Sequence, residues 1–254
     1  PYTYDYFSET LRKRDTFSQE IRFLSKNTDF SEKKPFEWVF GFDFSELEET
    51  NVTRDAGIYG DPSDPYGPYA SESIIARNYE AKNLSLFGNI DYFLSDNYKL
   101  AFGLRWENWN SKYKDSNQES FKPSDNMNGG KVSLIKNNGN TNIYLSFARG
   151  YKQGGFNLGL DATDNTIKDS LIYDPEFLTN YEIGINSKSN DMSFNYSTVI
   201  FFSKREDQQV LISKQVDPTD PNTFSYLTQN AAEGENYGLE ISSNYLVSDN
   251  LNLS

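Results

Sequence analysis

The chain consists largely of runs in which apolar and polar residues alternate with a period of two. In the run at 141–148, Ile143, Leu145 and Phe147 fall on one side of an extended chain, and polar or small residues fall on the other. This pattern predicts a β-strand with one apolar face and one wet face. The alternation stops after Gly150, where glycines and aromatic residues interleave, as is typical of a strand that enters an irregular loop.

The same alternation recurs along the whole chain. One side of 36–45 carries Phe36, Trp38, Phe40, Phe42 and Phe44, a surface too apolar to leave in water. We expect about ten strands, the last of them starting after residue 250. The other nine cover 15–27, 36–45, 84–94, 98–107, 131–136, 141–148, 181–186, 192–202 and 237–247.

The connections between these runs alternate between very short and very long. Short turns fall near residues 95, 138, 190 and 249, and the turn at 137–140 contains Asn and Gly residues that tolerate a positive φ. Long polar stretches cover 47–80, 111–126, 151–177 and 206–225. In bacterial membrane barrels the short turns are periplasmic and the long loops extracellular, so we expect that assignment here.

The lengths of the runs distinguish a membrane barrel from a soluble β-sandwich. Several runs extend over about 9–13 residues, enough for a tilted strand to cross a bilayer, whereas strands of soluble domains usually have about 5–6 residues. Tyr98, Trp106, Trp109 and Tyr245 lie toward strand ends and suit the aromatic girdles of such barrels. Because an open sheet edge in lipid leaves backbone groups unpaired, the predicted fold is all-β, part of a larger closed antiparallel transmembrane β-barrel.

Composition narrows the functional classes. The net charge of -13 argues against a nucleic-acid surface, and the absence of Cys and His removes thiolate chemistry and the commonest general base and zinc ligand. The mean hydropathy of -0.73 is too polar for a helical membrane protein but is compatible with a barrel, in which every second strand residue meets lipid. No carboxylate pair, phosphate loop or nucleophile elbow is apparent in the sequence, so we expect no enzyme and no cofactor.

Three stretches resemble a known family. These are FARGYKQGGFN at 147–157, PEFLTNYEIGINSK at 175–188 and NAAEGENYGLEISSNY at 230–245. In this order and spacing they resemble the barrel domain of TonB-dependent outer-membrane receptors. The resemblance implies a 22-stranded barrel that surrounds a plug. The chain opens without a signal peptide and ends inside an alternating run, so we expect residues 1–254 to be an internal portion of such a barrel, without the N-terminal plug or the C-terminal strands.

The resemblance also implies a function. It implies an active importer in the bacterial outer membrane that binds a scarce ligand, commonly a ferric siderophore, and receives energy from the TonB–ExbB–ExbD complex through the plug. A cobalamin or a glycan is an equally compatible ligand. On this reading Arg149, Tyr151, Lys152 and Gln153 line the vestibule and touch the substrate, while the neighbouring glycines let the strand turn outward.

Two further sets of residues have alternative interpretations. The Asp-Pro pairs at 61–65 and 217–221 suit either a calcium site or ordinary turns, and turns are favoured. The inward-facing charges either form a transport path or plug contact, or belong to a solvated wall with local ion pairs, and the wall is favoured. These charges are Arg105, Glu107, Glu182 and Glu240.

Three rival functions share the alternation pattern. A passive porin has the same strands without a plug, a barrel-embedded protease or lipase needs catalytic residues in segments not seen here, and a secreted β-sandwich adhesin is soluble without detergent. Burial of Phe36, Trp38, Phe40, Leu100 and Leu104 between two stacked sheets would favour the sandwich.

Overall fold

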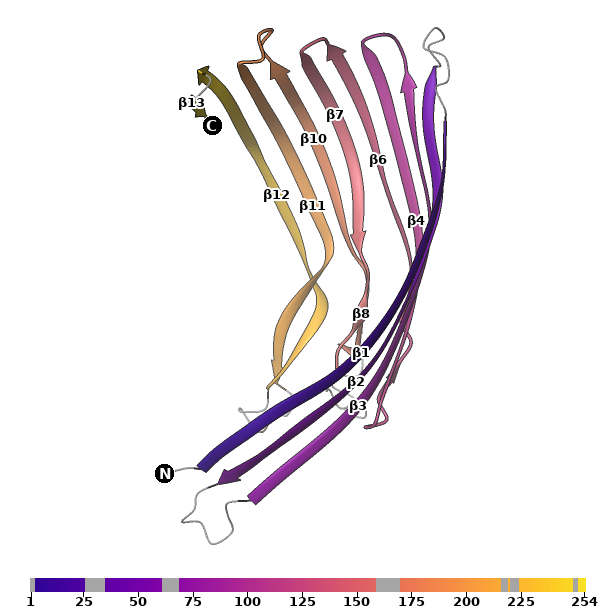
Figure 1. The fold of residues 1–254 in the computed structure, drawn as a ribbon, viewed down its shortest axis with the longest axis vertical. Helices are drawn as coiled ribbons and strands as arrows, with labels where there is room; N and C mark the ends of the chain where they lie inside the picture. The colour runs from indigo at the N-terminus through magenta and orange to yellow at the C-terminus, as the bar shows by residue number, and fades with distance from the viewer. Residues whose placement is uncertain are drawn as a thin grey trace. The chain divides into compact units, whose positions relative to one another are not determined.

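The computed structural model describes residues 3–25, 35–60, 69–158, 170–215, 219, 224–248 and 251–254. Within these ranges the regular structure is almost entirely β-strand (Figure 1). The strands are β1 Thr3–Leu24, β2 Phe36–Gly60, β3 Tyr69–Phe93, β4 Tyr98–Asp115, β5 Ser120–Phe121, β6 Ser124–Asn138, β7 Thr141–Lys152, β8 Gly155–Phe156, β9 Ile172–Tyr173, β10 Glu176–Lys188, β11 Phe194–Gln215, β12 Phe224–Ser248 and β13 Leu251–Leu253.

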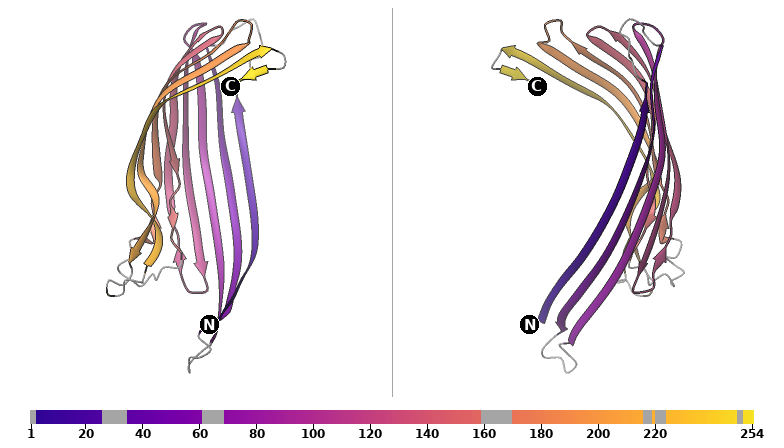
Figure 2. Two further views of the ribbon diagram at one scale, coloured as in Figure 1. Left: turned by 90° about the vertical axis from the view of Figure 1, so that its left-hand side faces the viewer. Right: turned by 45° about the vertical axis from the view of Figure 1, so that its right-hand side comes forward.

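Ten strands follow one another in a single sheet, in the order β1-β2-β3-β4-β6-β7-β10-β11-β12-β13, and β5 pairs only with β4. Apart from β5, β8 and β9, strands that are neighbours in the sheet also follow one another in the sequence, and the views in Figure 2 show the same succession. The pairs whose register is described are antiparallel. The all-β antiparallel fold and the expected ten strands are therefore confirmed. The first and last strands do not pair with each other among the described residues, so the barrel is not closed within this chain.

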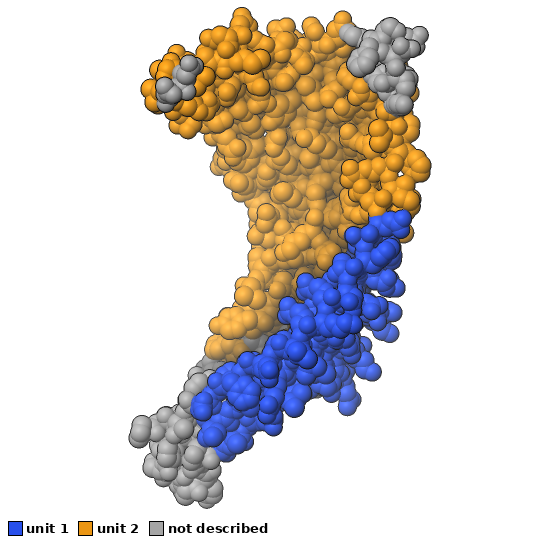
Figure 3. Space-filling view, in the orientation of Figure 1, with its two compact units in different colours: residues 1–19, 44–83, 109–124 blue, residues 20–43, 84–108, 125–254 orange. Residues whose placement is uncertain are grey.

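The chain divides into two compact units (Figure 3). Unit 1 contains residues 1–19, 44–83 and 109–124, and unit 2 contains 20–43, 84–108 and 125–254. Several long strands run through both units, because the unit boundaries fall inside β1 to β4.

Unit 2 has two chemically distinct faces, which the strand register defines. One row of directly paired residues carries the aliphatic side chains Leu134, Leu145, Ile183, Ile200 and Leu239. All five are at least 42% exposed, although their side chains are aliphatic. Side chains this apolar need apolar surroundings. We call the face that carries this row the outer face.

An aromatic row lies two residues away on the outer face. It contains Phe147, Tyr181, Phe202 and Tyr237, and the Tyr181 ring lies 5.1 Å from that of Phe147 and 6.3 Å from that of Phe202. A second aromatic pair, Phe194 and Tyr245, lies eight residue steps along β11 and β12. At about 3.3 Å per residue and a tilt of about 40°, these rows are about 20 Å apart, close to the apolar height of a membrane barrel.

The opposite face, which we call the inner face, carries small and polar residues. Ser133 pairs with Ser146, and Ser146 pairs with Glu182. In the next row Tyr144 pairs with Gly184, and a Cβ on Gly184 would come within 2.5 Å of the Tyr144 ring. The wet face expected from the sequence is therefore confirmed.

The residues chosen to distinguish a barrel from a sandwich lie on one open sheet. Phe36, Phe40 and Leu104 are 46%, 46% and 57% exposed, and Trp38 and Leu100 are half-buried. No second sheet covers them among the described residues, since β8 and β9 form the one other sheet and contain two residues each. This excludes the sandwich interpretation for the described part of the chain.

The short turns are confirmed where they are described. The turn between β3 and β4 is closed by a hydrogen bond from Leu94 N to Tyr98 O of 2.9 Å, and Gly139 has a φ of +63° in the β6–β7 turn. In the β10–β11 turn the Asp191 carboxylate accepts hydrogen bonds from the Ser189 hydroxyl and from Ser193, and they hold the pKa of Asp191 below its usual value. Residues 249 and 250 of the last turn lie outside the described residues.

The predicted extent of three of the long loops was wrong. Strand β2 continues to Gly60 and β3 starts at Tyr69, so most of 47–80 is strand. Much of 111–126 is also ordered, because β4 runs to Asp115 and β5 folds back on it. Strand β11 covers 206–215. Strands whose two faces both meet water need no apolar alternation, so the periodicity that marks a strand is lost there.

Unit 1 stabilises these polar strands by other means. Glu49 lies 2.5 Å from Arg14 and 3.2 Å from Arg12 across the strands. The buried rings of Tyr113 and Phe121 lie 6.0 Å apart, where β5 folds onto β4. Trp109 is also buried, at 3% exposure, which corrects its assignment to an aromatic girdle.

The fold does not decide whether the two Asp-Pro stretches form a calcium site or ordinary turns. The Asp-Pro stretch 61–65 lies outside the described residues, as does 217–221 apart from Thr219. None of the helical structure in the described part of the chain is long and apolar enough to span a membrane.

Candidate ligand-facing site

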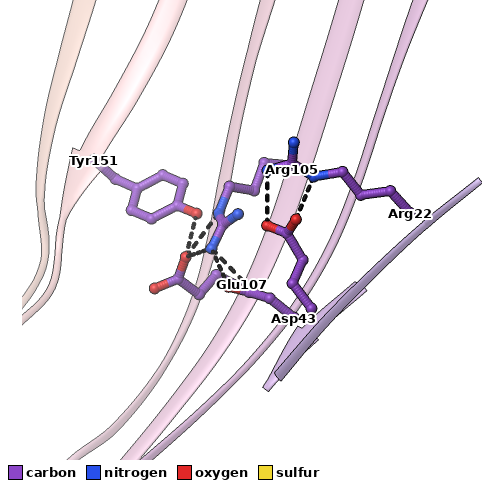
Figure 4. A network of polar contacts seen from close by, with 6 residues as sticks. Arg22, Asp43, Arg105, Glu107 and Tyr151 are labelled. Atoms are coloured by element: carbon purple, nitrogen blue, oxygen red, sulfur yellow. Dashed lines mark hydrogen bonds and ion pairs between the residues drawn. The ribbon is translucent and has the colours of Figure 1, made fainter. Parts of the chain in front are cut away.

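A charged network lies on the inner face of unit 2, across β2, β4 and β7 (Figure 4). The Arg105 guanidinium donates to Glu107 Oε2 at 2.9 Å and to Asp43 at 3.2 Å. The Tyr151 hydroxyl donates to the same Glu107 oxygen at 2.9 Å. Glu107 is 9% exposed, so its charge depends on these partners, because an unpaired carboxylate at this depth would be strongly penalised.

An aromatic ring joins this network to a second ion pair. The guanidinium carbons of Arg22 and Arg105 each lie 5.9 Å from the centre of the Phe87 ring. Arg22 also pairs with Glu20 on its own strand. Gly41 allows the ring to lie there, because a Cβ at this position would overlap Phe87. The wall is thus a line of alternating charges held over an aromatic surface.

The four residues expected to touch substrate are brought close together but face different neighbours. Arg149, Tyr151 and Gln153 line a hollow of about 650 Å³ together with Arg105 and Glu107. Lys152 is exposed next to them but is not among the residues lining this hollow.

Tyr151 is the residue of the four that joins the charged network. Its ring lies against Gly129, where a Cβ would come within 3.0 Å of the ring. The described β6–β7 pairing ends just before, at Gly130 and Arg149. Gly129 therefore gives the ring space to approach β4, a role that the sequence analysis missed.

Arg149 and Gln153 make contacts of a different kind. The Arg149 guanidinium lies 4.4 Å over the Phe177 ring, a cation–π contact between β7 and β10. The Gln153 carbonyl accepts a hydrogen bond of 2.8 Å from Gln209 Nε2. The Gln153 backbone therefore helps to attach the segment after β7 to β11.

A second cluster anchors the segment between β7 and β10. The Asn157 side chain donates to Ser170 O at 2.6 Å and to Thr228 O at 2.8 Å, and it accepts from Thr228 N at 2.7 Å. Asn157 is 9% exposed. One amide side chain thus joins the two ends of the segment to β12.

Further side chains extend this cluster. Asn230 donates to the carbonyl oxygens of Asp174 at 2.8 Å and Asp207 at 2.7 Å, and it accepts from Asp174 N. The buried Glu176 accepts from Gln209 N at 2.9 Å and lies 3.3 Å from Arg205 Nε. This junction coincides with a bulge between Arg205 and Gln208. Asp207 has a φ of +54° there.

The glycines of the GGFN stretch serve close packing within this junction. A Cβ on Gly154 would come within 2.5 Å of the Tyr173 carbonyl oxygen, and a Cβ on Gly155 would overlap the Tyr173 side chain. This supports a structural role for these glycines. The role differs from the one expected, since the glycines allow close contact between β8 and β9 and not a simple outward turn of the strand. The signal for this junction in the sequence was the set of three family motifs, because Asn157, Glu176 and Asn230 come one from each of them.

The described residues contain no group of three or more His, Cys, Asp or Glu side chains placed to hold a metal ion. The polar side chains that line the hollow include the Glu107 carboxylate, the guanidinium groups of Arg105 and Arg149, the Tyr151 phenol and the Gln153 amide.

Comparisons with known proteins agree with this architecture. The family model described as TonB dependent receptor-like, beta-barrel matches residues 1–254. A probable TonB-dependent siderophore receptor PiuA of Acinetobacter baumannii is 25% identical over 182 residues, which are 69% of this chain and 23% of PiuA.

Two solved structures are similar in fold. The ferric yersiniabactin uptake receptor FyuA of Yersinia pestis has a TM-score of 0.64 at 18% identity, covering 96% of this chain and 34% of FyuA. The copper transporter OprC has a TM-score of 0.64 at 14% identity, covering 96% of this chain and 37% of OprC. The chain thus spans about a third or less of the length of these relatives. With a two-faced antiparallel sheet and a family match over its whole length, the chain belongs to the TonB-dependent receptor β-barrel family.

Proposed function

We propose that this chain forms part of the wall of an active importer in the outer membrane of a Gram-negative bacterium. The cargo is a ferric siderophore or another iron complex, and the energy comes from the TonB–ExbB–ExbD complex. The observation that carries the proposal is the sheet itself. Its outer face is apolar and exposed, and its inner face carries a charged wall.

The cargo class draws support from the relatives. PiuA is described as a probable siderophore receptor, FyuA takes up ferric yersiniabactin, and OprC transports copper. All three names refer to metals or metal complexes.

We further propose that Arg149, Tyr151, Lys152 and Gln153 contribute to ligand contact. Cationic side chains and amides complement the carboxylate or catecholate oxygens that commonly surround iron in such complexes. A ligand that contacts Tyr151 would also be linked to the Arg105–Glu107 pair, because the Tyr151 hydroxyl already donates a hydrogen bond to Glu107.

The test is uptake by cells. A strain that lacks the receptor is complemented with the full receptor, and uptake of radiolabelled iron is measured over a panel of siderophores, with and without a functional TonB. We expect uptake of at least one iron complex that requires both the receptor and TonB. Diffusion of small solutes that is indifferent to TonB would instead identify a passive porin.

Site variants sharpen the test. Replacing Lys152 with Gln and Tyr151 with Phe should weaken ligand binding about tenfold or more together, since each removes a polar contact worth about 1 kcal/mol. Lys188→Gln at the far end of β10 is the matched control. Unchanged binding by a normally folded Lys152/Tyr151 double variant would refute the site while leaving the transport proposal intact.

A further inference from the structure

Gly150 is a glycine in the interior of β7 that lines the ligand-facing hollow. It lies between Arg149 and Tyr151, and all three residues line the hollow of about 650 Å³. A glycine inside a strand loses more conformational entropy on folding than other residues and offers no side chain for packing. Such a glycine usually serves a positive φ, a β-bulge, close packing of a neighbouring group, or the close approach of a ligand.

The backbone at Gly150 is that of an ordinary strand. Its φ does not lie in the left-handed region, in contrast to that of Gly139. Gly150 pairs with Leu178 of β10, and the pairing of β7 with β10 continues without a register shift over the whole length of β7. Neither a turn nor a bulge therefore requires a glycine at this position.

Packing does not require a glycine at position 150 either. A Cβ on Gly150 would meet no atom of the described residues within 4 Å. Other glycines that line the hollow differ, because a Cβ on Gly130 would lie 2.8 Å from Gly103 O, and a Cβ on Gly129 would lie 3.0 Å from Arg149 O. Those glycines allow close contacts within the sheet, whereas Gly150 borders open space.

The strand register shows that this open space belongs to the hollow. Residues two positions apart in a strand share a face, and Tyr144 and Ser146 of β7 lie on the inner face. Gly150 continues this series, because the pairing is not interrupted between Ser146 and Gly150. A side chain at position 150 would therefore extend from the inner face into the hollow that Arg149 and Tyr151 also line.

We propose that Gly150 sets the size of the iron complex that can contact Arg149 and Tyr151, because the missing side chain lets the ligand lie against the backbone of β7. This role rests on the proposed function and adds a size limit to the same site. A larger residue at position 150 would occupy volume that the ligand needs. It would also lose less conformational entropy on folding, so stability and ligand binding should change in opposite directions.

The first test measures uptake by cells that carry the full receptor. The wild type is compared with G150A, G150L and G150W, and the probes are ferric citrate and the ferric complexes of a tricatecholate and a trihydroxamate chelator. We expect uptake of the imported complex to fall as the residue at position 150 grows, by about tenfold or more in G150W. The control is N195W, since Asn195 is an exposed residue of β11 that does not line the hollow, and it should keep wild-type uptake.

Thermal unfolding of the purified receptor separates this role from a structural one. G150A and G150L should unfold at the wild-type temperature or above it, because the new side chain meets no neighbour among the described residues. G130A should unfold at a lower temperature, because its Cβ would contact the Gly103 carbonyl oxygen. A lower unfolding temperature of G150A would overturn the inference in favour of a packing role.

The variant G150C tests whether the space beside Gly150 is open in the complete receptor. This chain contains no Cys, so G150C introduces its one thiol. We expect a small charged methanethiosulfonate to modify this thiol in the purified receptor. An unreactive thiol would mean that another part of the receptor lies against Gly150, and it would overturn the inference.

The uptake measurement also distinguishes failure of the inference from failure of the proposed function. Equal uptake by G150W and the wild type would overturn the inference and leave the proposed function intact. Absence of uptake of all three complexes by the wild type would refute the proposed function, and the size limit with it.

Discussion

The two ends of the long strands differ sharply in composition although both are β-sheet. In β3, residues 84–93 expose apolar side chains such as Leu84, Leu86 and Tyr92, whereas 69–83 expose Glu72, Glu80 and Lys82. In β2 the same change occurs between the aromatic residues of 36–44 and the polar stretch 45–60. This difference shows that alternation of apolar and polar residues indicates a strand whose two faces meet different solvents. A strand with water on both faces need not show it.

The largest expected effect comes from a charge on the outer face. Ile183→Arg places a cation in the aliphatic row and should destabilise the folded barrel by about 2–4 kcal/mol, the cost of Arg near a bilayer midplane. Val52→Arg is the control: Val52 is similarly exposed at 41%, but in the polar stretch of β2, and its replacement should cost about 0–1 kcal/mol.

Urea-dependent folding into lipid vesicles measures both free energies. Equal costs at the two positions would contradict the difference between the two ends of the strands.

A smaller effect is expected at the anchor of the β7–β10 segment. Asn157→Ala leaves Thr228 N without its acceptor and removes two donated bonds, so the junction should lose about 1–3 kcal/mol of local stability. Hydrogen exchange should accelerate at Thr228 and leave the pair Leu145–Ile183 unchanged. Asn142→Ala, an exposed amide on the inner face, is the control and should not change exchange at Thr228.

The charged wall should show a coupling of about 1 kcal/mol. Arg105→Gln removes the cation from Glu107 and Asp43, but Arg105 is 37% exposed, so solvent screening reduces the loss. A double-mutant cycle with Glu107→Gln measures the coupling directly. A coupling near zero would contradict a stabilising ion pair between Arg105 and Glu107.

The smallest effect concerns a tyrosine in unit 1. Burial, and then the hydrogen bond that its hydroxyl donates to Asp115, raise the pKa of Tyr113 to about 12. Because the folded pKa lies above the unfolded value of about 10, the stabilisation is complete below pH 10 and is lost as the pH rises through 12.

Ultraviolet titration of the wild type and of Tyr113→Phe isolates this group. The variant should lack one late-ionising phenol and should be destabilised by about 1 kcal/mol near neutral pH. Ionisation of that phenol near pH 10 would contradict the buried packing of Tyr113 against Phe121.

Prediction from the sequence succeeded where the two faces meet different solvents. The run 98–107, for example, was recovered because lipid on one side and water on the other impose a period of two on it. The turns near 95, 138 and 190 were found because tight hairpins need particular residues. The ends of β2, β3 and β11 were missed because polar residues occur on both faces of these strand ends and leave no periodic signal.

The candidate site was only partly visible in the sequence. The three motifs marked the right segments, but their spacing could not reveal that Asn157, Glu176 and Asn230 meet at one junction. Likewise, Arg105, Glu107 and Tyr151 were named separately, and only strand order and register place them together.

The sequence by itself determined that this protein has strands with one apolar and one wet side, since local alternation needs no knowledge of distant residues. Its three motifs also identified the family. The tertiary structure decided which side chains share a wall, where Gly129 admits Tyr151, and how the segment between β7 and β10 is anchored to β12. These depend on contacts between residues far apart in the sequence, for example 44 positions for Tyr151 and Glu107 and 71 positions for Asn157 and Thr228. Such contacts are set by the register of neighbouring strands and not by any local pattern.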